Sequence, residues 1–180
     1  LMAAGYYLPN QDTFATARGN AYVATADSAS AVFYNPAGMT QLERPELQAG
    51  VYSILLGNET NAGGVHSEAD SQVQAAPQVY YVQPFNDRLS FGFGLNSPFG
   101  LGTDWGDDTP FSPVVTEVGL AYLSATSAVA YKVTDTLSLG ASVSLNYADL
   151  MLEQGIFGTP AGNYLRYEGD DYAFSGSLSV

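Results

Sequence analysis

Alternation of apolar and polar residues is the strongest pattern in the chain. From Leu89 to Asn96 the odd-numbered residues are leucine or phenylalanine, and the even-numbered residues are serine, glycine or asparagine. Successive side chains of a β-strand point to opposite faces of its sheet, so this period of two predicts a strand with one apolar face. The same alternation runs through residues 137–147 and 172–180.

Three further segments predict strands with a less regular alternation: residues 47–56, 73–82 and 118–131. The last segment changes phase near Tyr122, where we expect a β-bulge. The connections alternate between short ones, at residues 83–88 and 132–136, and long ones, at residues 57–72, 103–117 and 151–171. This order predicts an antiparallel meander of about six strands, with tight turns at one end and long loops at the other.

Two architectures are compatible with this meander, a soluble antiparallel sandwich or barrel and a transmembrane β-barrel. Three features favour the membrane barrel: the predicted strands approach ten residues, their polar faces carry glycine, serine and asparagine, and the charges lie in the connections. A strand needs about 9–11 residues to cross a bilayer and must present an apolar face to lipid. We therefore predict an all-β fold, a transmembrane antiparallel β-barrel with small polar residues lining its lumen.

The first 45 residues lack this alternation. Residues 15–27 are rich in alanine with an interrupting glycine, and Asn35-Pro36 predicts a turn. A wide barrel can hold such a partly helical segment as a plug, or hatch, in its lumen. We expect a hatch at residues 1–45 and the first barrel strands at residues 46–180. Because about six strands cannot enclose a plug, we expect a barrel truncated at the C-terminus.

Composition and charge narrow the possible functions. The chain of 180 residues has 18 acidic and 5 basic residues, a net charge of −13 and no cysteine. Nucleic acid is not expected as a partner, because phosphate binding needs clustered lysine and arginine. The 13% of charged residues is about half of the share usual in soluble domains. No apolar run is long enough for a transmembrane helix.

An enzymatic function is not expected. The single histidine, His66, lies in a polar loop, and the sequence contains no P-loop, nucleophile elbow or HExxH motif. We predict no catalytic residue, no cofactor and no metal site.

Residues 18–27 (RGNAYVATAD) and 28–40 (SASAVFYNPAGMT) resemble the FadL/TodX family of outer-membrane transporters for hydrophobic compounds. Asn35, Pro36 and Ala37 correspond to the hatch motif of that family. Further matches follow in the same order at residues 43–50, 83–87 and 96–103. Members have on the order of 14 strands, within the range of bacterial barrels, and the resemblance implies that about six of them are present here.

The resemblance implies passive uptake at the bacterial outer membrane. A hydrophobic molecule is captured by outward-facing loops, enters the barrel and leaves sideways through a gap at an inward kink of the third strand. That kink corresponds to Ser97, Pro98 and Gly100. The residue types agree, because proline lacks the N–H that a ladder requires and glycine tolerates unusual backbone angles. The alternative is an ordinary strand end that leads into an acidic loop.

The resemblance also implies roles for individual residues. Asn35 is expected to bond the hatch to the kinked strand. The expected ligand contacts lie at the start of the hatch and after the kink: Tyr6, Tyr7, Leu8, Phe99 and Leu101. In the third long loop, Ile156, Phe157 and Leu165 are expected to form an external capture site. The expected partners are the hydrophobic ligand, outer-membrane lipid and lipopolysaccharide, and the barrel is expected to be monomeric.

The sequence leaves the substrate open between long-chain fatty acids and aromatic or aliphatic hydrocarbons. A general porin or a purely structural barrel is a further alternative. Porins select ions with rings of charged side chains, whereas the predicted lumen residues are uncharged and the hatch would block bulk ion flow.

Overall fold

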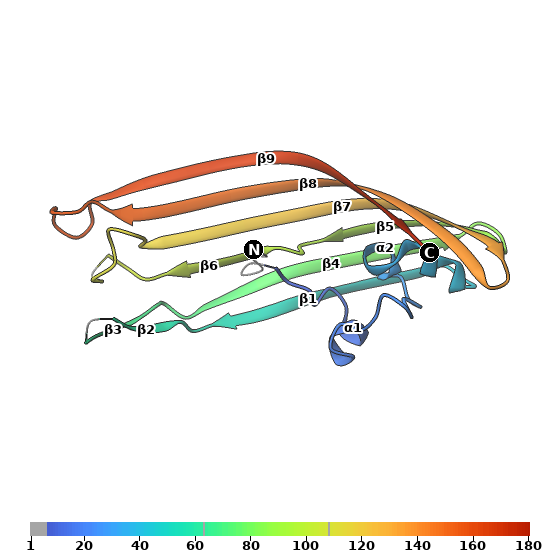
Figure 1. Cartoon of the computed structure of the whole chain (residues 1–180), viewed down its shortest axis with the longest axis horizontal. Coiled ribbons are helices and arrows are strands. Elements are labelled where there is room, and N and C mark those ends of the chain that lie inside the picture. The colour runs from blue at the N-terminus through green and yellow to red at the C-terminus, as the bar shows by residue number, and fades with distance from the viewer. Residues whose placement is uncertain (1–6, 63, 108) are drawn as a thin grey trace.

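The computed structural model describes residues 7–62, 64–107 and 109–180 as one curved sheet with a short helical segment packed against it (Figure 1). The helices are α1 (Thr13–Ala17), α2 (Ala31–Tyr34) and the 3-10 helix η1 (Pro36–Gln41). The strands are β1 (Glu46–Leu56), β2 (Glu59–Ala62), β3 (Val65–Glu68), β4 (Gln72–Pro84), β5 (Leu89–Asn96), β6 (Gly100–Asp104), β7 (Glu117–Thr134), β8 (Leu137–Gly155) and β9 (Tyr164–Ser179). Among the described residues, none of the helices is long and apolar enough to cross a bilayer.

The main sheet is an antiparallel meander in the order β1-β4-β5-β7-β8-β9, and β6 continues β5 as a second partner of β7. Strands β2 and β3 form a separate hairpin beyond β1 and β4. In Figure 1 the short connections lie at one end of the sheet and the long ones at the other. We call these the turn end and the loop end.

Two expectations about the strands are wrong. Strand β7 itself carries no bulge near Tyr122, because it pairs with β8 without a register shift from Glu117 to Lys132, and the one shift in this pair lies between Lys132 and Thr134. The extra residue near Tyr122 lies on the opposite strand, between Asn96 and Gly100. The connection expected at residues 151–171 is mostly strand, since β8 continues to Gly155 and β9 begins at Tyr164. Polar residues extend this hairpin because they bond across it.

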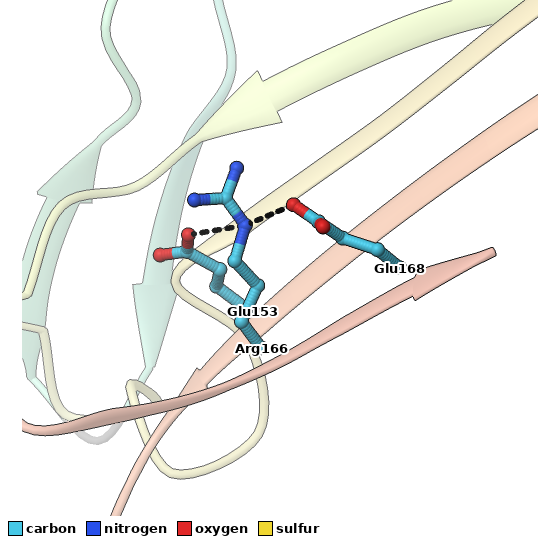
Figure 2. Close-up of polar contacts among 3 residues, drawn as sticks. All are labelled: Glu153, Arg166 and Glu168. Atoms are coloured by element: carbon cyan, nitrogen blue, oxygen red, sulfur yellow. Dashed lines mark ion pairs between the residues drawn. The ribbon is translucent and has the colours of Figure 1, made fainter.

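Figure 2 shows one such bond network in the hairpin of β8 and β9. The Arg166 Nε atom lies 2.7 Å from a carboxylate oxygen of Glu168 and 3.3 Å from one of Glu153. Glu153 is the register partner of Arg166. The Arg166–Glu153 pair joins the two strands where the sequence pattern alone indicates a loop, and Glu168 adds a second carboxylate from the same strand as Arg166.

The two faces of the sheet differ in chemistry. One face exposes large apolar side chains, as expected for a wall in contact with lipid; they include Leu47, Val79, Phe91, Phe93, Leu145 and Phe174. On the other face Ser124 bonds to Asn146 and Thr126 to Ser144, so small polar groups satisfy one another across the strands. This inner face also carries the N-terminal segment, residues 7–45.

The N-terminal segment packs tightly on the inner face of β4, β5, β7 and β8. Its buried residues Tyr22, Val32 and Met39 form one apolar cluster with Tyr80, Val82 and neighbouring alanines. Glycine makes this approach possible, because a Cβ atom added at Gly92 would overlap Met39 and Val32. The missing side chain at Gly92 therefore lets the segment lie this close to the wall.

Candidate functional site

The wall is interrupted between β4 and the continuation of β5. Strands β4 and β5 pair from Pro84 with Ser90 to Gln78 with Asn96. Beyond that point residues 72–77 of β4 pair only with β1, and β6 pairs only with β7. The ladder of hydrogen bonds that joins neighbouring barrel strands is thus missing along the loop-end part of β4, residues 72–77.

A proline stands on each side of this gap. If the register of β4 and β5 continued, Pro77 would lie opposite Ser97, and Ala76 opposite Pro98. Neither proline has an N–H group to donate to a ladder. Pro98 was predicted from the sequence and Pro77 was not, although a proline inside a predicted strand is itself a signal of missing pairing.

An extra residue in the break shifts the register with β7. Asn96 pairs with Ser124 and Gly100 pairs with Ala121, so three residues on one strand face two on the other. Gly100 has a φ of 139°, and a Cβ atom there would lie 3.0 Å from the carbonyl oxygen of Leu120. The three residues of the expected kink, Ser97, Pro98 and Gly100, all lie in this break.

The N-terminal segment takes the place of the missing ladder. The Leu8 amide donates a hydrogen bond of 2.8 Å to the Pro98 carbonyl oxygen, and Tyr7 forms an antiparallel bridge with Phe99. The Gln11 side chain donates to the carbonyl oxygens of Ser97 at 3.0 Å and of Leu8 at 2.9 Å. Backbone carbonyls that β4 leaves unpaired at the break are therefore satisfied from inside.

Gln11 is the central residue of this contact and was missed from the sequence. Its side chain is 1% exposed, and its Oε1 atom accepts a hydrogen bond of 3.3 Å from the amide of Asn96. A single glutamine outside any motif gives no sequence signal, because its importance arises from the three backbone and side-chain groups that the fold places around it.

The expected bond from Asn35 to the kinked strand is wrong. Asn35 caps η1 by accepting from the Ala37 amide at 3.1 Å, and it donates to the carbonyl oxygens of Val23 at 2.9 Å and Val180 at 3.4 Å. These partners lie at the turn end, because η1 packs beside the start of β8 through the Thr40 hydroxyl, 2.7 Å from that of Ser138. The hatch motif thus anchors η1, and Gln11 holds the kink.

Tyr34 fixes the position of residues 9–11. Its hydroxyl donates to the Pro9 carbonyl oxygen at 2.8 Å and accepts from the Gln11 amide at 3.0 Å. Burial raises the pKa of Tyr34 to about 12, and the nearby charge of Asp12 acts in the same direction. The hydroxyl keeps its proton at neutral pH and can donate to Pro9.

A cavity of about 430 Å³ lies at the break. Leu8, Ile54, Ala76 and Tyr122 line it from the inner side, and outward-facing residues, which are Ala75, Leu123 and Tyr147, line it from the other. The ring of Phe99 lies between those of Tyr7, at 5.3 Å, and Tyr122, at 5.2 Å between centroids. The cavity therefore has walls from both faces of the sheet.

The other expected site residues lie apart from this cavity. Leu101 lines a smaller neighbouring cavity of about 280 Å³ beside Leu120. Phe157 and Ile156 lie in the connection of β8 and β9, where Phe157 is 88% exposed, and Leu165 lies at the start of β9. Tyr6 lies outside the described residues.

Together, the apolar outer face, the polar inner face and the N-terminal segment packed on it are the features of a wall segment from a membrane β-barrel. Residues 1–172 match the family described as "Outer membrane protein transport protein (OMPP1/FadL/TodX)". The chain belongs to this family, which confirms the resemblance, the fold class and the outer-membrane location expected from the sequence.

Known relatives and structures agree with this assignment. The chain is 29% identical over 136 residues to the "Long-chain fatty acid transport protein" of Escherichia coli K12, a match that covers 73% of the chain and 30% of that protein. The Pseudomonas aeruginosa FadL homologue has a TM-score of 0.75 at 20% identity, covering 96% of the chain and 48% of the homologue. The Pseudomonas putida toluene transporter TodX has a TM-score of 0.61 at 25% identity, covering 71% and 33%. The chain thus spans about a third of the length of the curated relatives it matches.

Proposed function

We propose that this chain forms part of an outer-membrane channel for passive uptake of hydrophobic small molecules, such as long-chain fatty acids or hydrocarbons. The ligand enters at the loop end, reaches the lumen and leaves sideways between β4 and β6. The cavity at the break carries this proposal, because side chains from both faces of the wall line it.

The position of the cavity along the strands, beside a row of outward-facing aromatic residues, supports a lateral exit into lipid. Leu123, Tyr147 and Tyr172 form one row across β7, β8 and β9, and the two tyrosine rings lie 4.8 Å apart. Aromatic side chains collect where the outer face of a barrel meets the membrane interface. A ligand that leaves beside Tyr147 therefore meets outer-membrane lipid, with lipopolysaccharide around the loop end.

The N-terminal segment acts as the hatch in this proposal. Tyr7 and Leu8 lie beside Phe99 at the break and contact the ligand there, while Gln11 keeps the hatch attached to the kink. Ile156, Phe157 and Leu165 provide apolar surface for first capture at the loop end. One barrel carries both steps, so a monomer is sufficient.

Filling the cavity tests the lateral exit. The full-length protein is expressed in cells that lack their own transporter, and uptake of a labelled long-chain fatty acid and of toluene is measured for wild type and Ala76→Trp. Ala76 lines the cavity, so uptake falls for whichever ligand is carried. Ala141→Trp is the matched control, because Ala141 lies on the lipid-facing side between Val129 and Leu178. Equal uptake by Ala76→Trp and Ala141→Trp contradicts the exit.

The porin alternative is tested by conductance. A hatch that fills the lumen keeps the steady ion current of the full-length protein in planar bilayers small. A large steady conductance favours a water-filled porin instead.

A further inference from the structure

Charge is distributed unevenly between the two ends of the wall. Among the described residues of the loop end, acidic side chains are numerous and Arg166 is the one lysine or arginine. The acidic side chains are Glu59, Glu68, Asp70, Asp104, Asp107, Glu117, Asp149, Glu153, Glu168, Asp170 and Asp171. The remaining lysine and arginine residues of the chain are Arg18 in the N-terminal segment and, at the turn end, Arg44, Arg88 and Lys132.

The positive charge of Arg166 is already compensated. The Arg166 Nε atom forms ion pairs with both Glu153 and Glu168 (Figure 2). Asp104, Glu117 and Glu153 are successive register partners across β6, β7 and β8, which places three carboxylates in one row beside it. An approaching anion therefore meets a negative potential on this part of the wall. At physiological ionic strength this potential decays over about 8 Å.

The cavity offers an anion no positively charged side chain either. Its lining contains no lysine, arginine or histidine within the described part of the chain. The Gln74 amide already donates to the Gly102 carbonyl oxygen at 3.1 Å, and the other side-chain donors of the lining are the uncharged hydroxyl groups of Ser97, Tyr122 and Tyr147. A carboxylate that enters this cavity loses its water and gains no cation, which is unfavourable, whereas an uncharged molecule loses little.

From these observations we propose that the gap between β4 and β6 admits uncharged lipophiles, such as hydrocarbons and long-chain alcohols, in preference to carboxylate anions. This inference rests on the proposed lateral uptake and narrows its ligand class. Chain length and apolar area contribute equally to the binding of an alcohol and of an acid of the same length. Only the charge of the head group separates them.

The test compares two ligands that differ in the head group. Cells that lack their own transporter express the full-length protein, and uptake of labelled 1-hexadecanol and hexadecanoate is measured at pH 8, where the acid is ionised. We expect hexadecanoate to enter at least about tenfold more slowly than the alcohol. Equal or faster uptake of hexadecanoate overturns the inference, and uptake of neither ligand contradicts the proposed function itself.

A variant with one added charge makes the test specific. Gln74→Lys puts an ammonium group at the cavity wall, where it can still donate to Gly102, and is expected to raise hexadecanoate uptake relative to the alcohol several-fold. Gln74→Met has a similar size and no charge, and is expected to keep the wild-type ratio. Equal ratios in these two variants overturn the inference, because the head-group charge then does not decide passage.

Discussion

The amide of Leu8 donates its hydrogen bond to the carbonyl oxygen of Pro98, 2.8 Å away, and so joins the N-terminal segment to the broken strand of the wall. In a continuous barrel the neighbouring strand would supply the bonds of this stretch. Here β4 stops pairing with β5 at Gln78. The same few residues that leave the wall open therefore attach the N-terminal segment to its inner face.

Replacing Gln11 with alanine tests this attachment. The change removes the bonds to the carbonyl oxygens of Ser97 and Leu8 and leaves buried acceptors unpaired, which costs about 1–3 kcal/mol. We expect faster amide hydrogen exchange at residues 7–11 and a lower free energy of unfolding for the full-length protein in lipid. Gln41→Ala is the control, since Gln41 is exposed and makes one bond of 3.3 Å to Thr25. Equal effects of the two changes argue against a special role of Gln11.

Replacing Gly100 with valine tests the backbone of the break. Its φ of 139° is unfavourable for any side chain, and the Cβ atom would press on the Leu120 carbonyl oxygen, with a strain of about 1–3 kcal/mol. We expect slower uptake while the electrophoretic shift of the folded barrel is retained. Gly57→Val provides the comparison, because a Cβ atom at Gly57 has open space. Wild-type uptake by Gly100→Val would rule out the lateral exit at this position.

Restoring the missing N–H groups tests the prolines. In the double variant Pro77→Val and Pro98→Val, both strands regain a donor, and we expect β4 to pair further along the broken strand. Uptake of a hydrophobic ligand then falls, and amide exchange of the residues at the gap slows. Pro113→Val, in the connection of β6 and β7, is expected to change neither. The two-proline explanation fails if exchange at the gap stays as fast as in wild type.

The raised pKa of Tyr34 predicts that the free energy of unfolding depends on pH in the alkaline range. An unfolded tyrosine ionises near pH 10, whereas in the folded protein its pKa is about 12. The stabilisation from the Tyr34 hydroxyl is therefore complete below pH 10 and is lost as the pH rises toward 12. The difference in free energy of unfolding between wild type and Tyr34→Phe should be about 1–3 kcal/mol at pH 8 and shrink above pH 10. A difference that stays constant to pH 12 contradicts this, and Tyr164→Phe, at an exposed position, should show little difference throughout.

The alternation of side chains made the wall predictable from the sequence. Strand β5 has the predicted bounds, Leu89–Asn96, because both of its faces obey one simple chemistry, apolar outside and small or polar inside. The extension of β8 and β9 into the expected connection at residues 151–171 was not predictable in this way. It depends on pairs such as Arg166 with Glu153, whose polar residues resemble those of a loop until their partners are known.

The site was predictable where a residue type limits the backbone and not where only contacts matter. Pro98 and Gly100 restrict pairing and torsion angles wherever they occur, so they indicated the break. The bond partners of Asn35 and Gln11 depend on how the N-terminal segment lies on the wall. That arrangement follows from close approach at Gly92 and from buried bonds between distant residues, which a single sequence does not specify.

The extra residue between Asn96 and Gly100 also changes which side chains of the strand point inward. Odd-numbered residues face the lipid before it and the inner side after it. Before the break, Leu95 pairs with Ala125 on the lipid side; after it, Leu101 pairs with Leu120, on the same side of β7 as the inner residue Tyr122. One residue thus exchanges exterior for interior without a turn. Deleting a single residue from 97–99 would remove the bulge and leave Leu101 and Thr103 on the inner side, because the shortened strand would then pair with β7 in one continuous register.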